Sequence, residues 1–452
     1  MLSIGRFFAD QVSLSSYLND LFYIFSTVGV LLGSLALVVI ESSLVDTKNV
    51  VDTIIQKTIC GIVGAASFLV VGYGIWNIQY YQAFGVPHAF TQSISDWWLF
   101  GPNLNTYAQH LDPAAVPGAD TQQIFMTFFL AFAALTAIMI QGAGVERMKS
   151  SAAYAMSAVV GGLGVPIVSY FVYGSASILT NNGLHDYVGL FSLYLFAGTW
   201  SVVLAAMLGK RVYAKPSLNF PLLMIGVTLL LAAIPMFVVG CGFLESTHGY
   251  FGISMNESGL GITVVNIFVA FCGGGLSGAW LAHRQRKPAL ALLGIIAGYV
   301  ACTALFDLAS PWQTFVVSLI GPFAMVFVGT LLSKLGVDDP KVAPLTLGPG
   351  IVGALAAGIV GGGRPTGGFF EIKTGEYAFQ HSHISLQMQG IGVVSVVLGT
   401  AIAAVVVLFI IDKTIGLRVS SNKERDGLDM HHWTDGNARD LAERSAMERP
   451  AN

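Results

Sequence analysis

Long apolar stretches follow one another along the chain, separated by short polar segments. A helix needs about 20 apolar residues to cross a hydrocarbon core about 30 Å thick. Eleven stretches meet or approach that length, at residues 20–42, 55–79, 122–144, 151–173, 187–208, 220–243, 260–283, 288–306, 311–333, 343–362 and 386–411. The pattern predicts an all-α integral membrane protein with eleven transmembrane helices.

Composition supports this class and argues against two others. Of 452 residues, 54% are hydrophobic and 10% are charged, and a net charge of −3 gives no basic field for nucleic acid. The sequence shows no nucleophile and base constellation, cofactor fingerprint or metal cluster, so neither an enzyme nor a bound cofactor is predicted. Glycine clusters at 161–164 and 273–275 lie inside spans, where small residues let helices approach closely. The four cysteines lack CxxC spacing and are expected to be packing residues.

Basic residues are unevenly distributed between the loops. The loops after the odd-numbered spans and the C-terminal tail are rich in Lys and Arg, whereas the alternate loops carry only Arg364 and Lys373. This asymmetry predicts an external N-terminus and a cytoplasmic C-terminus in a plasma membrane. The chain then divides into a membrane domain at 1–412 and a cytoplasmic tail at 413–452.

Several segments, in order along nearly the whole chain, resemble the ammonium transporter/Rhesus (Amt/Rh) family. They are Lys48–Val51 with Gly72–Gly74, Gly142–Met148, Asp338–Pro340 with Gly350–Gly353, and Gly416–Val419 with Gly427–Asp429. The resemblance implies a divergent bacterial-type member of the inner membrane. It also implies a 5+5 inverted repeat plus a final helix, and a homotrimer with one pore per subunit. Inverted repeats commonly place the substrate site near the membrane midplane.

Aromatic positions can be carried over from the family. Its paired gate phenylalanines fall on Phe128 and Phe132, which are four residues apart and so share a helix face, and their partner falls on Phe243. The external tryptophan falls on Tyr173, and the external serine falls on Thr247. Aromatic faces attract a bare cation by about 0.5 to 2 kcal/mol. In a chain with 29 phenylalanines, simple packing is the alternative for these rings.

Two acidic residues accompany the aromatic positions. Asp186 matches the family aspartate that supports the ammonium site, and N-capping of a helix is its other role. Glu245 stands where the family has a small residue. A carboxylate there favours a larger or multiply charged amine such as a polyamine, with Asp186 as a possible second carboxylate. The alternative is that Glu245 only caps or solvates a helix end.

The family's twin pore histidines are absent from their expected positions. The first falls on Tyr194, and the second falls on Leu347 or Thr346, depending on the direction of counting. An imidazole titrates near pH 6.5, whereas a tyrosine hydroxyl titrates near pH 10. The family's proton relay is therefore not expected in its usual form.

The tail positions Arg418, Gly427, Leu428 and Asp429 resemble the family's regulatory tail and imply a PII-type signal protein as partner. Composition alone predicts a mobile polar tail there. Three functions remain open: transport of ammonium or a larger amine through a modified pore, a non-conducting amine or polyamine receptor on the same fold, and gas conduction. Transport is the prediction that we carry forward.

Overall fold

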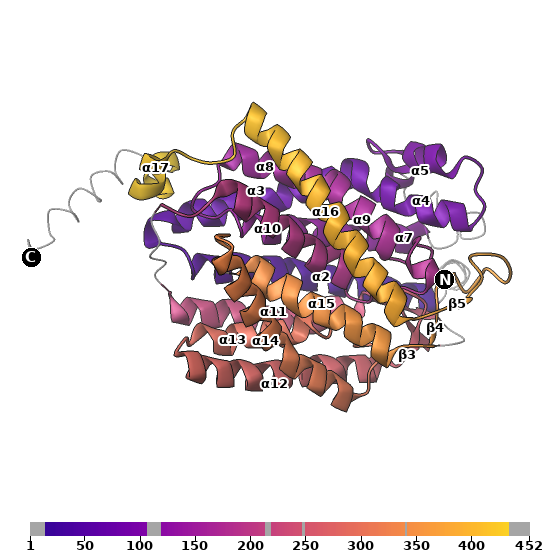
Figure 1. Ribbon diagram of the computed structural model, residues 1–452. Helices are drawn as coiled ribbons and strands as arrows, with labels where there is room; N and C mark the ends of the chain where they lie inside the picture. The colour runs from indigo at the N-terminus through magenta and orange to yellow at the C-terminus, as the bar shows by residue number, and fades with distance from the viewer. Residues whose placement is uncertain (1–13, 106–118, 213–217, 246–248, 340, 434–452) are drawn as a thin grey trace, which may run out of the picture.

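The computed structural model describes residues 14–105, 119–212, 218–245, 249–339 and 341–433. Long helices run side by side across the molecule, with the C-terminal segment at one end and short strands at the other (Figure 1). Ten helices in the described ranges are long and apolar enough to cross a membrane, and Ala289–Val300 is a shorter apolar helix. Together they account for the eleven predicted spans.

Three of the spans contain a π-helical stretch. In chain order, the spans are built from α2 (Leu14–Ser42), α3 (Val50–Ser67) with η2 (Phe68–Gly72) and α4 (Tyr73–Ala83), α7 (Ala119–Gln141), α8 (Ser150–Val159) with η4 (Val160–Gly164) and α9 (Val165–Val172), η6 (Leu190–Leu195) with α10 (Phe196–Leu208), α11 (Phe220–Val239), α12 (Leu260–Gln285), α13 (Ala289–Val300), α14 (Pro311–Lys334), α15 (Val342–Val360) and α16 (Leu386–Thr414).

Small residues bring several of these helices into close contact, as the glycine clusters predict. A Cβ atom on Gly274 of α12 would lie 2.6 Å from the carbonyl oxygen of Gly294 and 2.8 Å from Cα of Gly298, both in α13. Gly161 of η4 similarly abuts Gly64 of α3. A side chain at these crossings would force the helix backbones apart.

Helix α2 packs along α7 and α11, so the first and sixth spans lie side by side. Gly226 of α11 faces Ile40 of α2, where a Cβ atom would lie 2.8 Å from the Ile40 backbone nitrogen. Cys60, Cys241 and Cys302 are buried, Cys272 is exposed, and all four are free thiols. Burial of Cys60, Cys241 and Cys302 fits the expectation of packing residues, whereas Cys272 lies on the surface.

One end of the bundle, which we call the hairpin end, carries short strands that the all-α prediction did not include. β1 (Gly242–Glu245), β2 (Gly249–Gly252) and β3 (Glu257–Ser258) form an antiparallel sheet, and β4 (Pro365–Thr366) pairs with β5 (Ser382–His383). The short helices α5 (Ala89–Trp97) and η5 (Thr180–Asn182) belong to other connecting segments, and α6 (Pro102–Asn105) follows α5. Strands form here because these segments lie outside the membrane-spanning helices.

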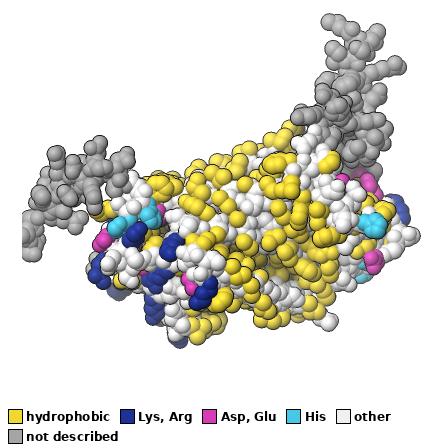
Figure 2. Space-filling view, turned by 90° about the horizontal axis from the view of Figure 1, so that it is seen from above, with side chains coloured by type: hydrophobic (Ala, Val, Ile, Leu, Met, Phe, Trp, Pro, Cys, Tyr) yellow, Lys and Arg dark blue, Asp and Glu magenta, His cyan; other side chains and the backbone are white. Residues whose placement is uncertain are grey.

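The opposite end, which we call the tail end, carries η1 (Thr47–Asn49), α17 (Ser421–Asp426) and α18 (Leu428–His432). Figure 2 shows a broad hydrophobic band between the two ends, with Lys and Arg side chains gathered at the tail end. Large apolar side chains in this band are exposed, including Trp280 at 57%, Phe327 at 68% and Ile402 at 67%. Such a surface is covered by lipid or by another subunit.

Candidate functional site

An aromatic cluster between α7 and the end of α9 brings together three of the predicted site residues. The rings of Phe128 and Phe132 lie 6.0 Å apart, and Phe132 stacks on Tyr173 at 6.5 Å and 12°. All three side chains are nearly fully buried. Trp76 helps to position Tyr173, because its indole nitrogen donates a 2.8 Å hydrogen bond to the Tyr173 carbonyl oxygen. Gly189 lies beside Phe132 with a φ of 72°, where a Cβ atom would lie 2.9 Å from the ring.

Phe243 lies elsewhere, although the sequence analysis placed it with this pair. Its ring stacks on Phe251 at 5.9 Å and on Phe369 at 6.4 Å, and contacts Phe370 at 6.3 Å. Among the described rings, none of its contacts is with α7. The reason is the hairpin, since pairing of β1 with β2 sets Phe243 opposite Phe251.

Glu245 ends β1 and is half-buried at the hairpin end. It lies two residues from Phe243, so both side chains project from the same face of the strand. The sequence analysis places Thr247 in the same external site, but Thr247 lies outside the described residues. The polyamine hypothesis for Glu245 therefore stays a prediction.

Asp186 caps the fifth span. Its two carboxylate oxygens accept hydrogen bonds from the backbone nitrogens of Leu190 at 2.7 Å and Phe191 at 3.0 Å. The hydroxyl of Ser254 donates to the Asp186 carbonyl oxygen at 2.6 Å. Asp186 has no exposed surface, so it is not placed to share a large diamine with Glu245. The capping interpretation is confirmed, and a supporting role beneath the aromatic cluster stays a prediction.

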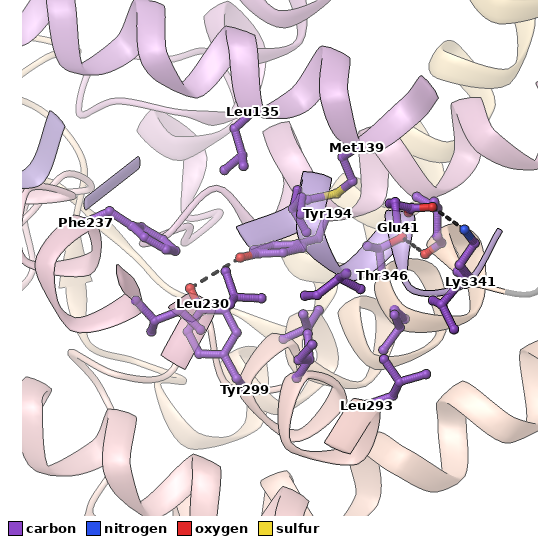
Figure 3. Close-up of a pocket in the computed structure, with 18 residues that line it drawn as sticks. Glu41, Leu135, Met139, Tyr194, Leu230, Phe237, Leu293, Tyr299, Lys341 and Thr346 are labelled. Carbon is purple, nitrogen blue, oxygen red and sulfur yellow. Dashed lines mark hydrogen bonds and ion pairs between the residues drawn. The ribbon is translucent and has the colours of Figure 1, made fainter. Parts of the chain in front are cut away.

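An internal cavity of about 70 Å³ lies between α2, α7, η6, α11, α13 and α15. Most of its wall is aliphatic, with contributions such as Leu135, Leu230 and Leu293. Figure 3 shows Tyr194 and Tyr299 toward one side, joined by a 3.3 Å hydrogen bond between their hydroxyls, and Glu41 with Lys341 toward the other. The cavity is large enough for a few water molecules or one small amine.

The cavity separates the two alternatives for the second histidine position. Thr346 contributes to the wall, and its hydroxyl donates to the Val342 carbonyl oxygen at 2.7 Å. Leu347 is not among the residues that line this cavity, and both residues lie close to α10, where a Cβ atom on Gly198 would be 2.5 Å from Thr346 Oγ1 and 3.0 Å from Leu347 Cβ. Tyr194 and Thr346 are thus the residues at the expected histidine positions that line this cavity.

Sequence reasoning missed four polar residues of this region: Tyr299, Glu41, Lys57 and Lys341. Glu41 and Lys57 lie within apolar spans, and an ionisable residue in a span is a signal of function. Lys341 had been counted only as a basic loop residue. Nothing in the sequence indicates that Tyr299 contacts Tyr194.

The predicted tail residues dock against the tail end of the bundle. Arg418 donates 2.7 Å hydrogen bonds to the carbonyl oxygens of Leu208 and Lys210. The backbone nitrogen of Leu428 donates to Asn49 Oδ1 at 2.8 Å, and Gly427 adopts a φ of 106°. Asp429 accepts from the Val51 and Asp52 backbone nitrogens at 3.1 and 2.7 Å, which caps the second span. The described part of the tail, up to residue 433, is therefore ordered on the bundle rather than free.

The sequence is similar to those of known membrane proteins. The sequence profile of the Ammonium Transporter Family matches residues 21–438. Ammonium transporter Amt2 of Methanocaldococcus jannaschii is 28% identical over 404 residues, which cover 86% of this chain and 84% of that protein. Amt1 of the same organism is 28% identical over 317 residues, covering 66% and 73%.

Solved structures share the fold at low identity. A protein described as a sensor Amt protein superposes with a TM-score of 0.73 at 20% identity, covering 93% of this chain and 99% of that one. Mep2 of Saccharomyces cerevisiae superposes with a TM-score of 0.68 at 17% identity, covering 91% of each chain. With the spans and the profile match, these findings show that the chain is a multi-pass membrane protein that belongs to the ammonium transporter family.

Proposed function

We propose that this protein binds ammonium or a small amine at the aromatic cluster and transports it through the internal cavity. One observation carries the proposal. Phe128 and Phe132 belong to the aromatic cluster, and Leu135 and Met139 line the cavity, all on α7. Their spacing of four, three and four residues places them on one helix face. A single stripe of α7 therefore runs from the aromatic cluster along the cavity.

The chemistry of this stripe suits a small cation that loses its water. Buried aromatic faces offset part of the cost of dehydration by cation–π attraction of about 0.5 to 2 kcal/mol. Inside the cavity, the hydroxyls of Tyr194 and Tyr299 can accept from and donate to an amine. A tyrosine stays protonated at neutral pH, so these hydroxyls bind the amine without an imidazole-type proton relay.

The distribution of charge supports an orientation with the hairpin end outside and the tail end in the cytoplasm of a plasma membrane. The exposed apolar band leaves surface for assembly as a homotrimer. The docked tail, with Arg418 and Asp429 at its contacts, is the segment that we propose a PII-type protein recognises.

Amine sensing without conduction is the second candidate. Two contacts at the cavity favour it. The Tyr194 hydroxyl is hydrogen-bonded to the Tyr299 hydroxyl, and a buried ion pair of Glu41 with Lys341 forms part of the cavity wall. Such contacts obstruct passage unless they open. Binding would then alter the docked tail without any flow of substrate.

Electrophysiology on solid-supported membranes tests both candidates. Proteoliposomes are exposed to ammonium, methylammonium, putrescine and spermidine, with thermal-shift binding measured in parallel. Transport predicts a sustained current, which Phe132→Ala lowers by about tenfold through loss of the cation–π contact. Phe268→Ala is the matched control, because Phe268 is 54% exposed on the apolar surface. Binding without current would favour the receptor, and neither response would contradict amine recognition.

A further inference from the structure

A buried cluster of three charges lies beside the cavity. Two of them, Glu41 and Lys341, line the cavity on the side opposite the tyrosine pair (Figure 3). Glu41 of α2 forms an ion pair through Oε2 with the ammonium of Lys341, which precedes α15. Its other oxygen, Oε1, lies 4.0 Å from the ammonium of Lys57 on α3. The three side chains are 8%, 7% and 0% exposed. One carboxylate thus faces two lysine ammonium groups away from bulk water.

The two lysines are held differently. Lys57 is fully buried within its span, and its ammonium donates a 2.8 Å hydrogen bond to the Ile138 carbonyl oxygen of α7. Lys341 stands at the N-cap of α15, and Glu41 is the group that its ammonium contacts. Lysine has a flexible four-carbon stem, so Lys341 can swing away while Lys57 remains as the counter-charge.

Neighbouring charges are already engaged by other groups. The Asp339 carboxylate accepts from the backbone nitrogens of Lys341, Val342 and Ala343 at 2.9 to 3.1 Å. Arg211 pairs with Asp338 at 2.7 Å and with Glu146. Oε2 of Glu41 is therefore the acceptor that would become available in the cavity if Lys341 moved.

The group that occupies this acceptor is chemically a primary ammonium ion. We propose that Glu41 is an internal binding site for ammonium or a small primary ammonium ion, and that Lys341 occupies it as a tethered competitor. The inference rests on the proposed function only in taking such an amine as the ligand that reaches the cavity. Exchange of one ammonium group for another conserves charge, and Lys57 stays beside Glu41 throughout.

The covalent tether determines how strongly the Lys341 ammonium competes with a free amine for Glu41. A group held on a short flexible tether acts at an effective concentration on the order of millimolar or above. A free amine at micromolar concentration then competes poorly with Lys341. Removal of the Lys341 ammonium should lower the dissociation constant at Glu41 by about tenfold or more.

Equilibrium dialysis of radiolabelled methylammonium against the purified full chain tests this site by stoichiometry. The variants are Lys341→Gln, which removes the competitor, Lys341→Arg, which keeps a cation there, and the double variant Glu41→Gln with Lys341→Gln. Lys210→Gln removes an exposed tail-end lysine outside the cavity wall and is the matched control. Thermal unfolding checks that each variant is folded. Lys341→Gln should fold because Glu41 keeps Lys57 as its charged partner.

We expect Lys341→Gln to bind one more methylammonium per chain than the wild type, while the other three variants bind as the wild type does. A wild-type protein that binds methylammonium, with no gain in Lys341→Gln, would overturn this inference alone. No binding by any variant would overturn it together with the proposed function. If the wild type binds no methylammonium and Lys341→Gln binds one, the result would support the internal site and contradict binding at the aromatic cluster.

Discussion

Glu245 adds a formal charge to a hairpin whose other prominent side chains are aromatic. It shares a strand face with Phe243, which stacks on Phe251 and Phe369. At 4 Å, one unit charge attracts another by about 1 kcal/mol in water and about 4 kcal/mol near a protein surface. The attraction grows with ligand charge, so we expect the Glu245 carboxylate to favour a polyamine over ammonium.

Replacement of Glu245 by alanine should weaken spermidine binding by roughly tenfold and ammonium binding by no more than about threefold, because spermidine carries more positive charge. Thermal-shift titrations with both ligands measure the two changes. Asp426→Ala is the control, since Asp426 is an exposed carboxylate of α17 at the opposite, tail end of the bundle. Equal weakening of both ligands by Glu245→Ala would remove this residue from recognition.

At the scale of one element, the fifth span begins as a π-helical stretch whose first amide groups are bound by Asp186. A helix start leaves backbone N–H groups without partners, and burial makes each unpaired group costly. Tyr194 lies eight residues further along the same segment. The cap therefore stabilises the element that carries a cavity residue.

Asp186→Ala should lower the free energy of unfolding by about 1 to 2 kcal/mol, as loss of an N-cap usually does. Asp186→Asn should cost less, because an amide keeps one oxygen acceptor. Thermal unfolding in detergent ranks the two variants against the wild type. An alanine variant as stable as the wild type would show that the cap contributes nothing.

At the scale of the whole molecule, an ion network joins the tail to the ends of several spans. Arg211 pairs with Asp338 at 2.7 Å and with Glu146 at 3.0 Å, and Arg147 pairs with Asp338 at 3.0 Å. Glu424 of α17 pairs with Arg418 at 2.7 Å and accepts from the Val212 backbone nitrogen at 2.6 Å. Segments after the third, fifth and ninth spans thus meet the tail at one place.

This network makes the folding stability of the protein depend on pH. Burial alone would raise the pKa of Asp338, but hydrogen bonds from Arg211 and the charges of Arg211 and Arg147 lower it to about 2. An unfolded Asp has a pKa of about 3.9, so the contribution of Asp338 is present above about pH 4 and is lost as the pH falls toward 2. The Tm of the wild type should therefore fall more steeply over that range than the Tm of Asp338→Asn. Parallel curves for the two proteins would contradict this role.

The sequence by itself determined the features that depend on local periodicity. Apolar runs of sufficient length become spans wherever they occur, and residues four apart, such as Phe128 and Phe132, must share a helix face. Glycine clusters such as Gly273–Gly275 likewise indicate close crossings, because a missing side chain removes the same steric barrier in any packing.

Only the tertiary structure decided which distant residues meet. A one-residue difference in register separates Thr346, which lines the cavity, from Leu347, which does not line it, and the sequence allowed both. Strand pairing set Phe243 opposite Phe251, and its described ring contacts are with Phe251, Phe369 and Phe370 rather than with Phe128 or Phe132. Glu41 and Lys341 form one ion pair although 300 residues separate them. Such contacts depend on how whole helices pack, and hydropathy along the chain carries no information about the partner of a buried charge.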